Sequence, residues 1–197
     1  MHISRPQPQR ITDKNIIVDI DDTLWPLAPT LHDELSLHYS IPPVSEWSDF
    51  GWWKKFMTIE EFWTISTGIS LRQDQYDPYP EAHIFLLAIK EMGFNPIIAS
   101  HRKAITSSAT QKFIIKNELA CGHLHISQDK TVLFDQNCIA VIDDNPDILE
   151  KAAMRGIPAF GLKCPWNREK RDHLYDNLFD ILDCIKALKD QPTEILA

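Results

Sequence analysis

Hydrophobic residues gather in three short continuous runs along the chain, and each run ends on a polar residue. The runs span residues 15–19, 95–100 and 138–143, and residues 158–162 form a further candidate. A continuous apolar run of this length is typical of a strand that is buried on both faces, because a half-exposed strand alternates apolar and polar positions. We therefore expect buried strands at these positions.

Segments of helical periodicity separate and follow the runs. They span residues 81–92, 103–119, 145–155 and 171–188. Gly93 and Gly156 follow two of them, where glycine readily ends a helix in a left-handed turn. Strands that alternate with helices predict a three-layer α/β fold with a Rossmann-like parallel sheet and right-handed crossovers. Ligands of such sheets bind beyond the carboxyl ends of the strands, so we expect Asp19, Ser100 and Asp143 to lie together there.

Residues 25–76 depart from this alternation, because they are helical in pattern and rich in aromatic side chains. Thr58 and Glu61 form a capping box, which predicts the start of a helix. We expect a helical cap at residues 25–76, inserted after the first strand. Residues 1–24 and 77–197 then form the core.

The aromatic residues of this insertion divide by their spacing. Those at helical spacing, together with one isoleucine, are Trp52, Phe56, Ile59 and Trp63. Helical spacing predicts that they pack in the interior of the cap. Phe50 and Trp53 fall off this stripe and are better candidates to face a bound molecule.

Composition and charge narrow the function classes. The 197 residues hold 20 basic and 28 acidic side chains, for a net charge of −8. Such an acidic protein is a poor general binder of polymeric nucleic acid or of anionic membranes. The four cysteines include no C-x-x-C pair, and no apolar run approaches the length of a membrane span. We therefore expect a cytoplasmic protein that binds small molecules.

The sequence Val-Asp-Ile-Asp-Asp-Thr-Leu at residues 18–24 holds the strongest chemical signal. A carboxylate such as Asp19 can attack phosphorus if a metal ion offsets the repulsion between two anions. A second carboxylate nearby, such as Asp21, can protonate the leaving oxygen and later deprotonate water. The alternative is an acidic loop that caps the next helix, since Asp and Thr both favour such positions.

Three further elements follow in order along the chain. Ser100 ends the second run, where a hydroxyl could hold a phosphoryl oxygen. Lys130 is a compact positive charge suited to a phosphoryl group or to Asp19, although most lysines are solvated on the surface. Asp143 and Asp144 follow the third run and could bind Mg²⁺ through oxygen, or cap the next helix instead.

Taken together, these elements resemble the haloacid-dehalogenase-like (HAD) phosphohydrolases. That family has D-x-D-x-T after the first strand, Ser or Thr after the second, a Lys, and then a paired acidic motif. The matching residues here are Asp19, Asp21, Thr23, Ser100, Lys130, Asp143 and Asp144. The resemblance implies a Mg²⁺-dependent phosphomonoester hydrolase that works through an aspartyl-phosphate on Asp19.

The resemblance also implies a role for each matching residue. Asp21 would be the general acid and base and would lend its backbone carbonyl to Mg²⁺. Ser100 and Lys130 would hold the phosphoryl group, with Thr23 beside them. Asp144 would be the direct metal ligand, with Asp143 behind it or exchanging roles. His101 follows Ser100 and could contact the phosphate or the leaving group, or be a surface residue at a helix start.

Two subgroups of the family compete for the substrate. The segments 129–132, 141–147 and 164–167, with the aromatic cap, look like the 5′(3′)-deoxyribonucleotidases, which act on nucleoside monophosphates. Residues 22–26 and 79–81 instead resemble magnesium-dependent phosphatases with a much shorter insertion. A protein of this fold that binds without catalysis is a third possibility. We expect a small phosphate ester, with a nucleotide as the first candidate.

Overall fold

The computed structural model describes residues 14–169 and 173–189, and its centre is one parallel sheet. The six strands lie in the order β3-β2-β1-β4-β5-β6. They are β1 (Asn15–Val18), β2 (Asn95–His101), β3 (His123–Ser127), β4 (Cys138–Ile142), β5 (Ala159–Leu162) and β6 (Leu174–Tyr175). The four expected strands are therefore confirmed, and all the pairings between neighbours are parallel.

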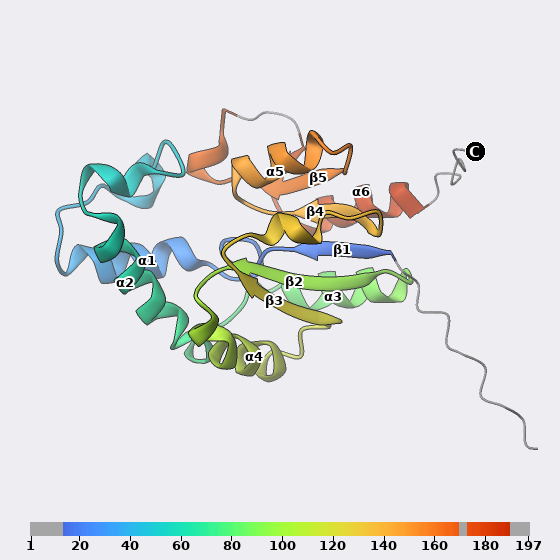
Figure 1. Cartoon of the computed structure of the whole chain (residues 1–197), viewed down its shortest axis with the longest axis horizontal. Helices are drawn as coiled ribbons and strands as arrows, with labels where there is room; N and C mark the ends of the chain where they lie inside the picture. The colour runs from blue at the N-terminus through green and yellow to red at the C-terminus, as the bar shows by residue number, and fades with distance from the viewer. Residues whose placement is uncertain (1–13, 170–172, 190–197) are drawn as a thin grey trace, which may run out of the picture.

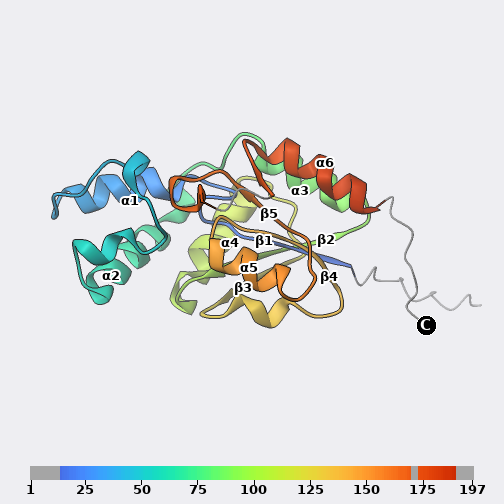
Figure 2. The ribbon, with the colours of Figure 1, turned by 90° about the horizontal axis from the view of Figure 1, so that it is seen from above.

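Helices cover both faces of the sheet, as Figure 2 shows for α3 and α6 on one side and α5 on the other. The α-helices are α1 (Leu27–Ser36), α2 (Ile59–Ser70), α3 (Ala82–Glu91), α4 (Ser107–Lys116), α5 (Pro146–Ala153) and α6 (Leu178–Lys189). Gly93 and Gly156 have positive φ angles just beyond α3 and α5, as expected of residues that end a helix. The prediction of a Rossmann-like α/β fold is confirmed.

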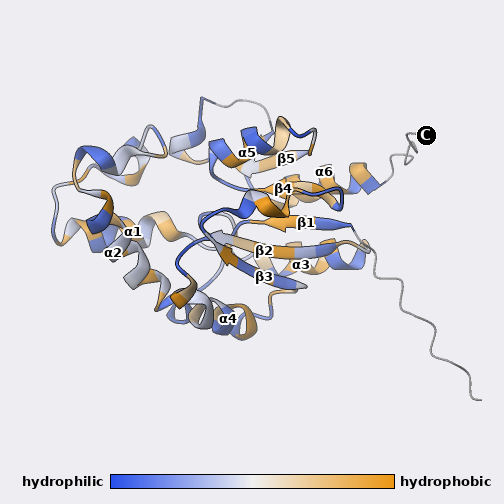
Figure 3. Ribbon diagram, viewed as in Figure 1, coloured by the Kyte–Doolittle hydropathy of each residue, from blue (hydrophilic) through white to orange (hydrophobic). Residues whose placement is uncertain are grey.

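The core has two parts, because successive residues of a strand point to opposite faces of the sheet. In β1, Ile16 and Val18 pack on the side of α3 and α6, whereas Ile17 packs on the side of α5. All three are almost fully buried. Figure 3 shows the resulting concentration of hydrophobic residues in the central strands. Continuous apolar runs were the right signature for these strands, since neither face meets water.

The segment between β1 and α3 lies beyond the carboxyl ends of the strands (Figure 1). It contains α1, α2 and three short 3₁₀ turns, η1 (Val44–Glu46), η2 (Trp52–Lys55) and η3 (Gln73–Gln75). Thr58 and Glu61 form the predicted capping box at the start of α2. Trp47 and Trp52 stack with ring centroids 3.7 Å apart and are buried. These aromatic residues thus pack together and join the hydrophobic core on the side of the sheet that bears α3 and α6.

The expected interior stripe along residues 52–63 is confirmed only for Trp52, which is buried, because the capping box at Thr58 interrupts the helix. Trp52 belongs to η2 and Trp63 to α2, so they do not share one helical face. Phe56 and Ile59, expected to be interior, are 36% and 57% exposed. Because a new helix starts after Thr58, the residues before and after it belong to separate helical segments, η2 and α2, with different axes.

The predicted helix at residues 171–188 begins later in the structure, at Leu178. The Asn177 side chain accepts a hydrogen bond from the backbone N–H of Asp180 at 3.0 Å, which defines the helix start. Leu174 and Tyr175 pair with β5 as an edge strand instead. Residues 171 and 172 lie outside the described part of the chain. No helix in the described residues is long and apolar enough to span a membrane.

Candidate active site

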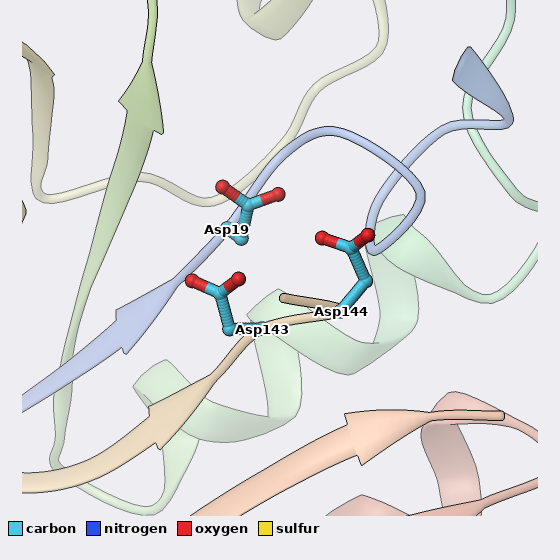
Figure 4. Close-up of side chains that lie close together, drawn as sticks. All are labelled: Asp19, Asp143 and Asp144. Carbon is cyan, nitrogen blue, oxygen red and sulfur yellow. The ribbon is translucent and has the colours of Figure 1, made fainter. Parts of the chain in front are cut away.

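The ends of two neighbouring strands bring the predicted carboxylates together. Asp19 follows β1 and Asp143 and Asp144 follow β4, and these strands are paired in parallel with Val18 opposite Ile142. The ligand oxygens of Asp19, Asp143 and Asp144 lie within 4.8 Å of one another, and all three residues are buried. Figure 4 shows the three side chains converging from the two strand ends. We call this set the acidic cluster.

Lys130 is the cation that the fold places against the acidic cluster. It begins the 3₁₀ turn η5 (Lys130–Leu133), and the Asp129 side chain caps this turn by accepting from the N–H of Thr131. The buried Lys130 ammonium donates to Asp19 Oδ1 and lies 2.6 Å from Asp143 Oδ2. Burial by itself lowers the pKa of Lys130, but the attraction of Asp143 and Asp19 outweighs it and holds that pKa above its ordinary value. Lys130 therefore stays charged.

Asp144 has a different environment from the other two acids. Its Oδ2 accepts a hydrogen bond from the indole N–H of Trp166 at 2.8 Å, and its backbone oxygen accepts from Asn167 Nδ2 at 3.0 Å. No lysine or arginine of the described residues forms an ion pair with it. Burial, then repulsion by Asp19 and Asp143, raises the pKa of Asp144 well above its ordinary value. Its carboxylate is held by a neutral donor alone.

The donor set of the acidic cluster fits a divalent cation. Three buried carboxylates face one buried ammonium group, so the cluster carries uncompensated negative charge when it is ionised. Burial also raises the pKa of Asp19 and of Asp143, which marks the cost of holding these charges without a counterion. Hard oxygen ligands of this kind suit Mg²⁺. Asp144 is the best-placed direct ligand, because Asp143 is engaged by Lys130 and by the N–H of Asn145.

The Asp21 side chain is turned away from the acidic cluster and toward Arg102. Arg102 Nε donates to Asp21 Oδ2 at 2.8 Å, and Arg102 Nη2 donates to Asp21 Oδ1. Trp25 Nε1 and Ser100 Oγ also donate to the two oxygens, at 2.9 and 3.1 Å. Burial alone would raise the pKa of Asp21, but the charge and hydrogen bonds of Arg102, with those of Trp25 and Ser100, lower it. Asp21 is therefore ionised, and its side chain is already engaged. Of the contacts predicted between Asp21 and a metal, only the one through its backbone carbonyl remains.

The other predicted phosphate-binding residues occupy distinct places. Ser100 is buried, and its hydroxyl is engaged by Asp21. Thr23 is fully buried, and its Oγ1 has no hydrogen-bond partner among the described residues. His101 lines the cavity described next and stacks on Trp63, with centroids 5.6 Å apart. Burial is the main cause that lowers the pKa of His101, so its neutral form is favoured.

A cavity of about 340 Å³ opens over these groups, between the strand ends and the inserted segment. Its acidic floor includes Asp19, Asp21, Asp143 and Asp144. Aromatic side chains of the insertion line its wall: Trp47, Phe50, Trp52, Trp53, Phe62 and Trp63. Trp53 stacks on Phe62 with centroids 4.5 Å apart. The predicted contacts Phe50 and Trp53 both face this cavity, and so does Trp63, which was expected to be interior.

Comparison with known proteins establishes the fold. No family model and no curated sequence matches the chain. Among solved structures, a HAD-superfamily hydrolase from Ehrlichia chaffeensis is 15% identical, with a TM-score of 0.52 over 88% of this chain and 96% of that one. The chain has the HAD-like fold.

Other matches with this fold differ in chemistry. A predicted phosphoglycolate phosphatase from Haemophilus somnus 129PT is 18% identical, with a TM-score of 0.58 over 88% of this chain and 98% of that one. A dehalogenase is 12% identical, with a TM-score of 0.56 over 87% and 96% of the two chains. Because one HAD-like fold carries both activities, the reaction has to be argued from the side chains.

The sequence did not reveal several residues that shape this site. Arg102 lies only two residues after Ser100, but its contact with Asp21 spans 81 positions and has no local signal. Trp166 belongs to a segment that the sequence singled out only for its resemblance to one subgroup. Asp22 takes a left-handed φ of 51° and accepts from the N–H of Ala28 at 2.8 Å, which fixes the start of α1. Burial raises the pKa of Asp22 to about 8.

Proposed function

We propose that this protein is a phosphomonoester hydrolase that uses Asp19 as its nucleophile and requires a divalent cation. The observation that carries the proposal is the meeting of Asp19, Lys130, Asp143 and Asp144 at adjacent strand ends on the floor of the cavity. A purely structural ion-pair network would need no open cavity above it. It would also have no reason to leave Asp144 without a cationic partner among the described residues.

The proposed reaction has two displacement steps. In the first, a carboxylate oxygen of Asp19 forms a bond to phosphorus and the bond to the leaving oxygen breaks, while Asp21, which is ionised at rest, relays to this oxygen a proton taken from solvent when the leaving group needs one. In the second, water attacks the phosphorus of the aspartyl-phosphate and gives its proton to Asp21. The bond between phosphorus and Asp19 then breaks and inorganic phosphate leaves. Asp21 releases its proton to solvent, so both side chains return to their ionised starting forms.

The acidic cluster would hold the cation through Asp19 and Asp144, and the backbone carbonyl of Asp21 is a further candidate ligand. When bound, a divalent cation neutralises charge on the phosphate and so reduces its repulsion by the carboxylates. Lys130 keeps the Asp19 carboxylate fixed in direction, because its ammonium is itself held by Asp143. The cavity wall limits the access of bulk water to the reacting groups.

We further propose that residues 25–76 act as a cap over the core and that the substrate is a nucleoside monophosphate. The support is the aromatic wall of the cavity, since flat rings suit a nucleobase better than a bare sugar. Small phosphorylated metabolites and phosphopeptides are the competing substrates. Trp25 belongs to the segment that resembles the magnesium-dependent phosphatases, and its indole N–H donates to Asp21. This contact is the structural basis for the alternative of a phosphatase that acts on another small phosphorylated substrate.

Hydrolysis of 4-nitrophenyl phosphate with MgCl₂ and with excess EDTA tests the core of the proposal. We expect turnover only with the cation, and Asp19→Asn should lower it by several orders of magnitude while the variant stays folded. Asp33→Asn is the matched control, because its carboxylate is 86% exposed and should leave turnover unchanged. Full activity in EDTA refutes the metal requirement, and Asp19→Asn activity within about tenfold of wild type refutes the covalent step.

A screen of nucleoside monophosphates, sugar phosphates and phosphopeptides tests the substrate. The nucleotides should give the highest kcat/KM. If another class does, the nucleotide assignment fails while the phosphatase proposal stands. If no phosphate ester is hydrolysed with Mg²⁺, the protein is a binding module that has kept the fold.

A further inference from the structure

Arg102 is a buried arginine whose guanidinium group is fully engaged by the protein itself. Nε and Nη2 donate to the two oxygens of Asp21, as a planar fork matched to a carboxylate. Nη1 donates to Gln73 Oε1 at 2.6 Å and to Thr110 Oγ1 at 3.0 Å. Each of its three nitrogens thus already has an acceptor, so Arg102 is held in place and has little capacity left to bind a substrate anion.

The acceptors on the far side of Arg102 are themselves fixed. Thr110 lies on α4 and donates its hydroxyl to Gln73 Oε1 at 2.9 Å, so the three side chains form a closed triangle. Gln73 is fully buried in η3, which follows the inserted helix α2. Its Oε1 accepts two hydrogen bonds, whereas its Nε2 has no partner among the described residues. Its buried amide therefore serves the guanidinium and the Thr110 hydroxyl.

We propose that Arg102 is a positioning residue that orients the Asp21 carboxylate to take the proton of the attacking water in the second step. The proposal rests on the proposed function, since it concerns one step of that reaction. The bidentate contact fixes both carboxylate oxygens, so the plane of the acid cannot rotate. In this step the water O–H bond breaks, its proton passes to Asp21, and the water oxygen forms the new bond to phosphorus as the bond to Asp19 breaks.

The same contacts tie the base to the inserted segment. Gln73 follows α2 and accepts from Arg102, which lies just beyond the end of β2, the core strand that contains Ser100. A shift of η3 would move an acceptor of Nη1 and so tilt the whole planar fork. Thr110 provides the second acceptor from α4, and it limits that tilt. The orientation of Asp21 is therefore set jointly by the insertion and the core.

The test is Arg102→Ala with 4-nitrophenyl phosphate and MgCl₂. Its leaving group departs without needing a proton, so the first step proceeds and only the second step suffers. We expect kcat to fall by about 100-fold, the range for loss of an oriented general base. KM should fall in proportion, so that kcat/KM stays within about threefold of wild type. A rapid burst of nitrophenolate, close to one per protein molecule, should precede slow turnover as the aspartyl-phosphate accumulates.

Three further variants separate positioning from folding. Arg72→Ala is the matched control, because Arg72 forms an exposed ion pair with Glu34 and should leave both constants unchanged. Arg102→Lys keeps the charge but cannot span both oxygens, so it should show the same split between kcat and KM if Arg102→Ala does not fold. Asp21→Asn should show the split too, and adding Arg102→Ala to it should lower kcat no further.

Two results overturn the proposal. A parallel loss of kcat and kcat/KM with no burst, in Arg102→Lys as well as Arg102→Ala, means that Arg102 only maintains the fold. A raised KM with unchanged kcat means that Arg102 binds the substrate directly. Both differ from failure of the proposed function, in which the wild-type protein itself releases no nitrophenolate in MgCl₂.

Discussion

Asp144 is buried beside two other acids without a cationic partner among the described residues, so Asp144→Asn should stabilise the metal-free protein. A buried unpaired carboxylate costs several kcal/mol, of which a hydrogen bond to a charged group returns about 1.5–3 kcal/mol. The Trp166 indole supplies that bond, and it can still donate to the amide oxygen of asparagine. The net gain is on the order of 2 kcal/mol. For a chain of this size that raises Tm by about 4–8 °C.

The pH dependence of this effect has a definite sign. Because the folded-state pKa of Asp144 lies above its ordinary value of 3.8, the folded protein holds this proton more tightly than the unfolded chain. The stability that this provides is present at low pH and is lost as pH rises through the folded pKa. One such group contributes at most about 1.4 kcal/mol per pH unit. The metal-free wild type should therefore lose stability with rising pH more steeply than Asp144→Asn.

Thermal unfolding with EDTA and with MgCl₂, across a pH series, measures both effects. At a Mg²⁺ concentration 100 times its Kd, the cation should stabilise the wild type by about 2.7 kcal/mol and so raise its Tm. The Tm of Asp144→Asn should rise much less. The order of the two proteins should thus reverse, or the gap should close, when Mg²⁺ is added. Asp33→Asn should track the wild type throughout, because its carboxylate is exposed. A lower Tm for Asp144→Asn in EDTA, or an equal response of both proteins to Mg²⁺, refutes the reasoning.

Four other substitutions test the cavity and its support. Phe50→Ala and Trp53→Ala should lower kcat/KM for the best nucleotide more than for 4-nitrophenyl phosphate, and an unchanged ratio contradicts base stacking. Trp166→Phe removes the indole donor to Asp144, the metal ligand that we propose, so calorimetric titration should show cation affinity about 10–100-fold weaker, whereas unchanged affinity removes this role. Gly161→Ala would place Cβ 2.6 Å from the backbone oxygen of Asp143, so it should lower both Tm and turnover, and a neutral effect would mean that β5 shifts freely.

The position of the acidic cluster could be predicted because it depends on local patterns that combine in a simple way. Asp19 and Asp143 each end an apolar run, and a parallel sheet brings such ends to the same edge. Neither step requires knowledge of side-chain contacts between distant segments. The same reasoning placed Ser100 at the end of β2, next to β1. Strand register then fixed the distances within the cluster.

The orientation of Asp21 could not be predicted, since it depends on contacts made at long range. The sequence offered Asp21 as a general acid and base but indicated no partner for its carboxylate. The structure instead gives Asp21 four donors, from Trp25, Ser100 and Arg102. A bidentate arginine outweighs a second carboxylate as a partner, because it supplies charge and two aligned donors at once. Only the folded chain brings Arg102 near enough to compete.

The interior of the insertion was predicted poorly for a related reason. A helical spacing rule assumes one continuous axis, and the capping box at Thr58 starts a new one. The sequence contained both signals, but spacing alone does not say which one determines the packing. Trp63 consequently lines the cavity, where its ring stacks on the imidazole of His101. The side chains that join insertion and core were thus the hardest to assign.

Lys130 and Arg102 are buried cations that line the cavity, and sequence composition could not show that both are already paired. Lys130 is held by Asp19 and Asp143, and Arg102 by Asp21, so both positive charges are already neutralised by carboxylates. A phosphate dianion that entered the cavity would find Asp144 as well, with no buried cation of the described residues left to meet it. The buried basic side chains therefore organise the nucleophile and the base, and the cations left to attract the substrate are Lys54 and Lys103, which line the cavity and are exposed. A divalent cation held at Asp144, as we propose, would add to this attraction, and binding of the phosphate and of the metal would then be mutually dependent.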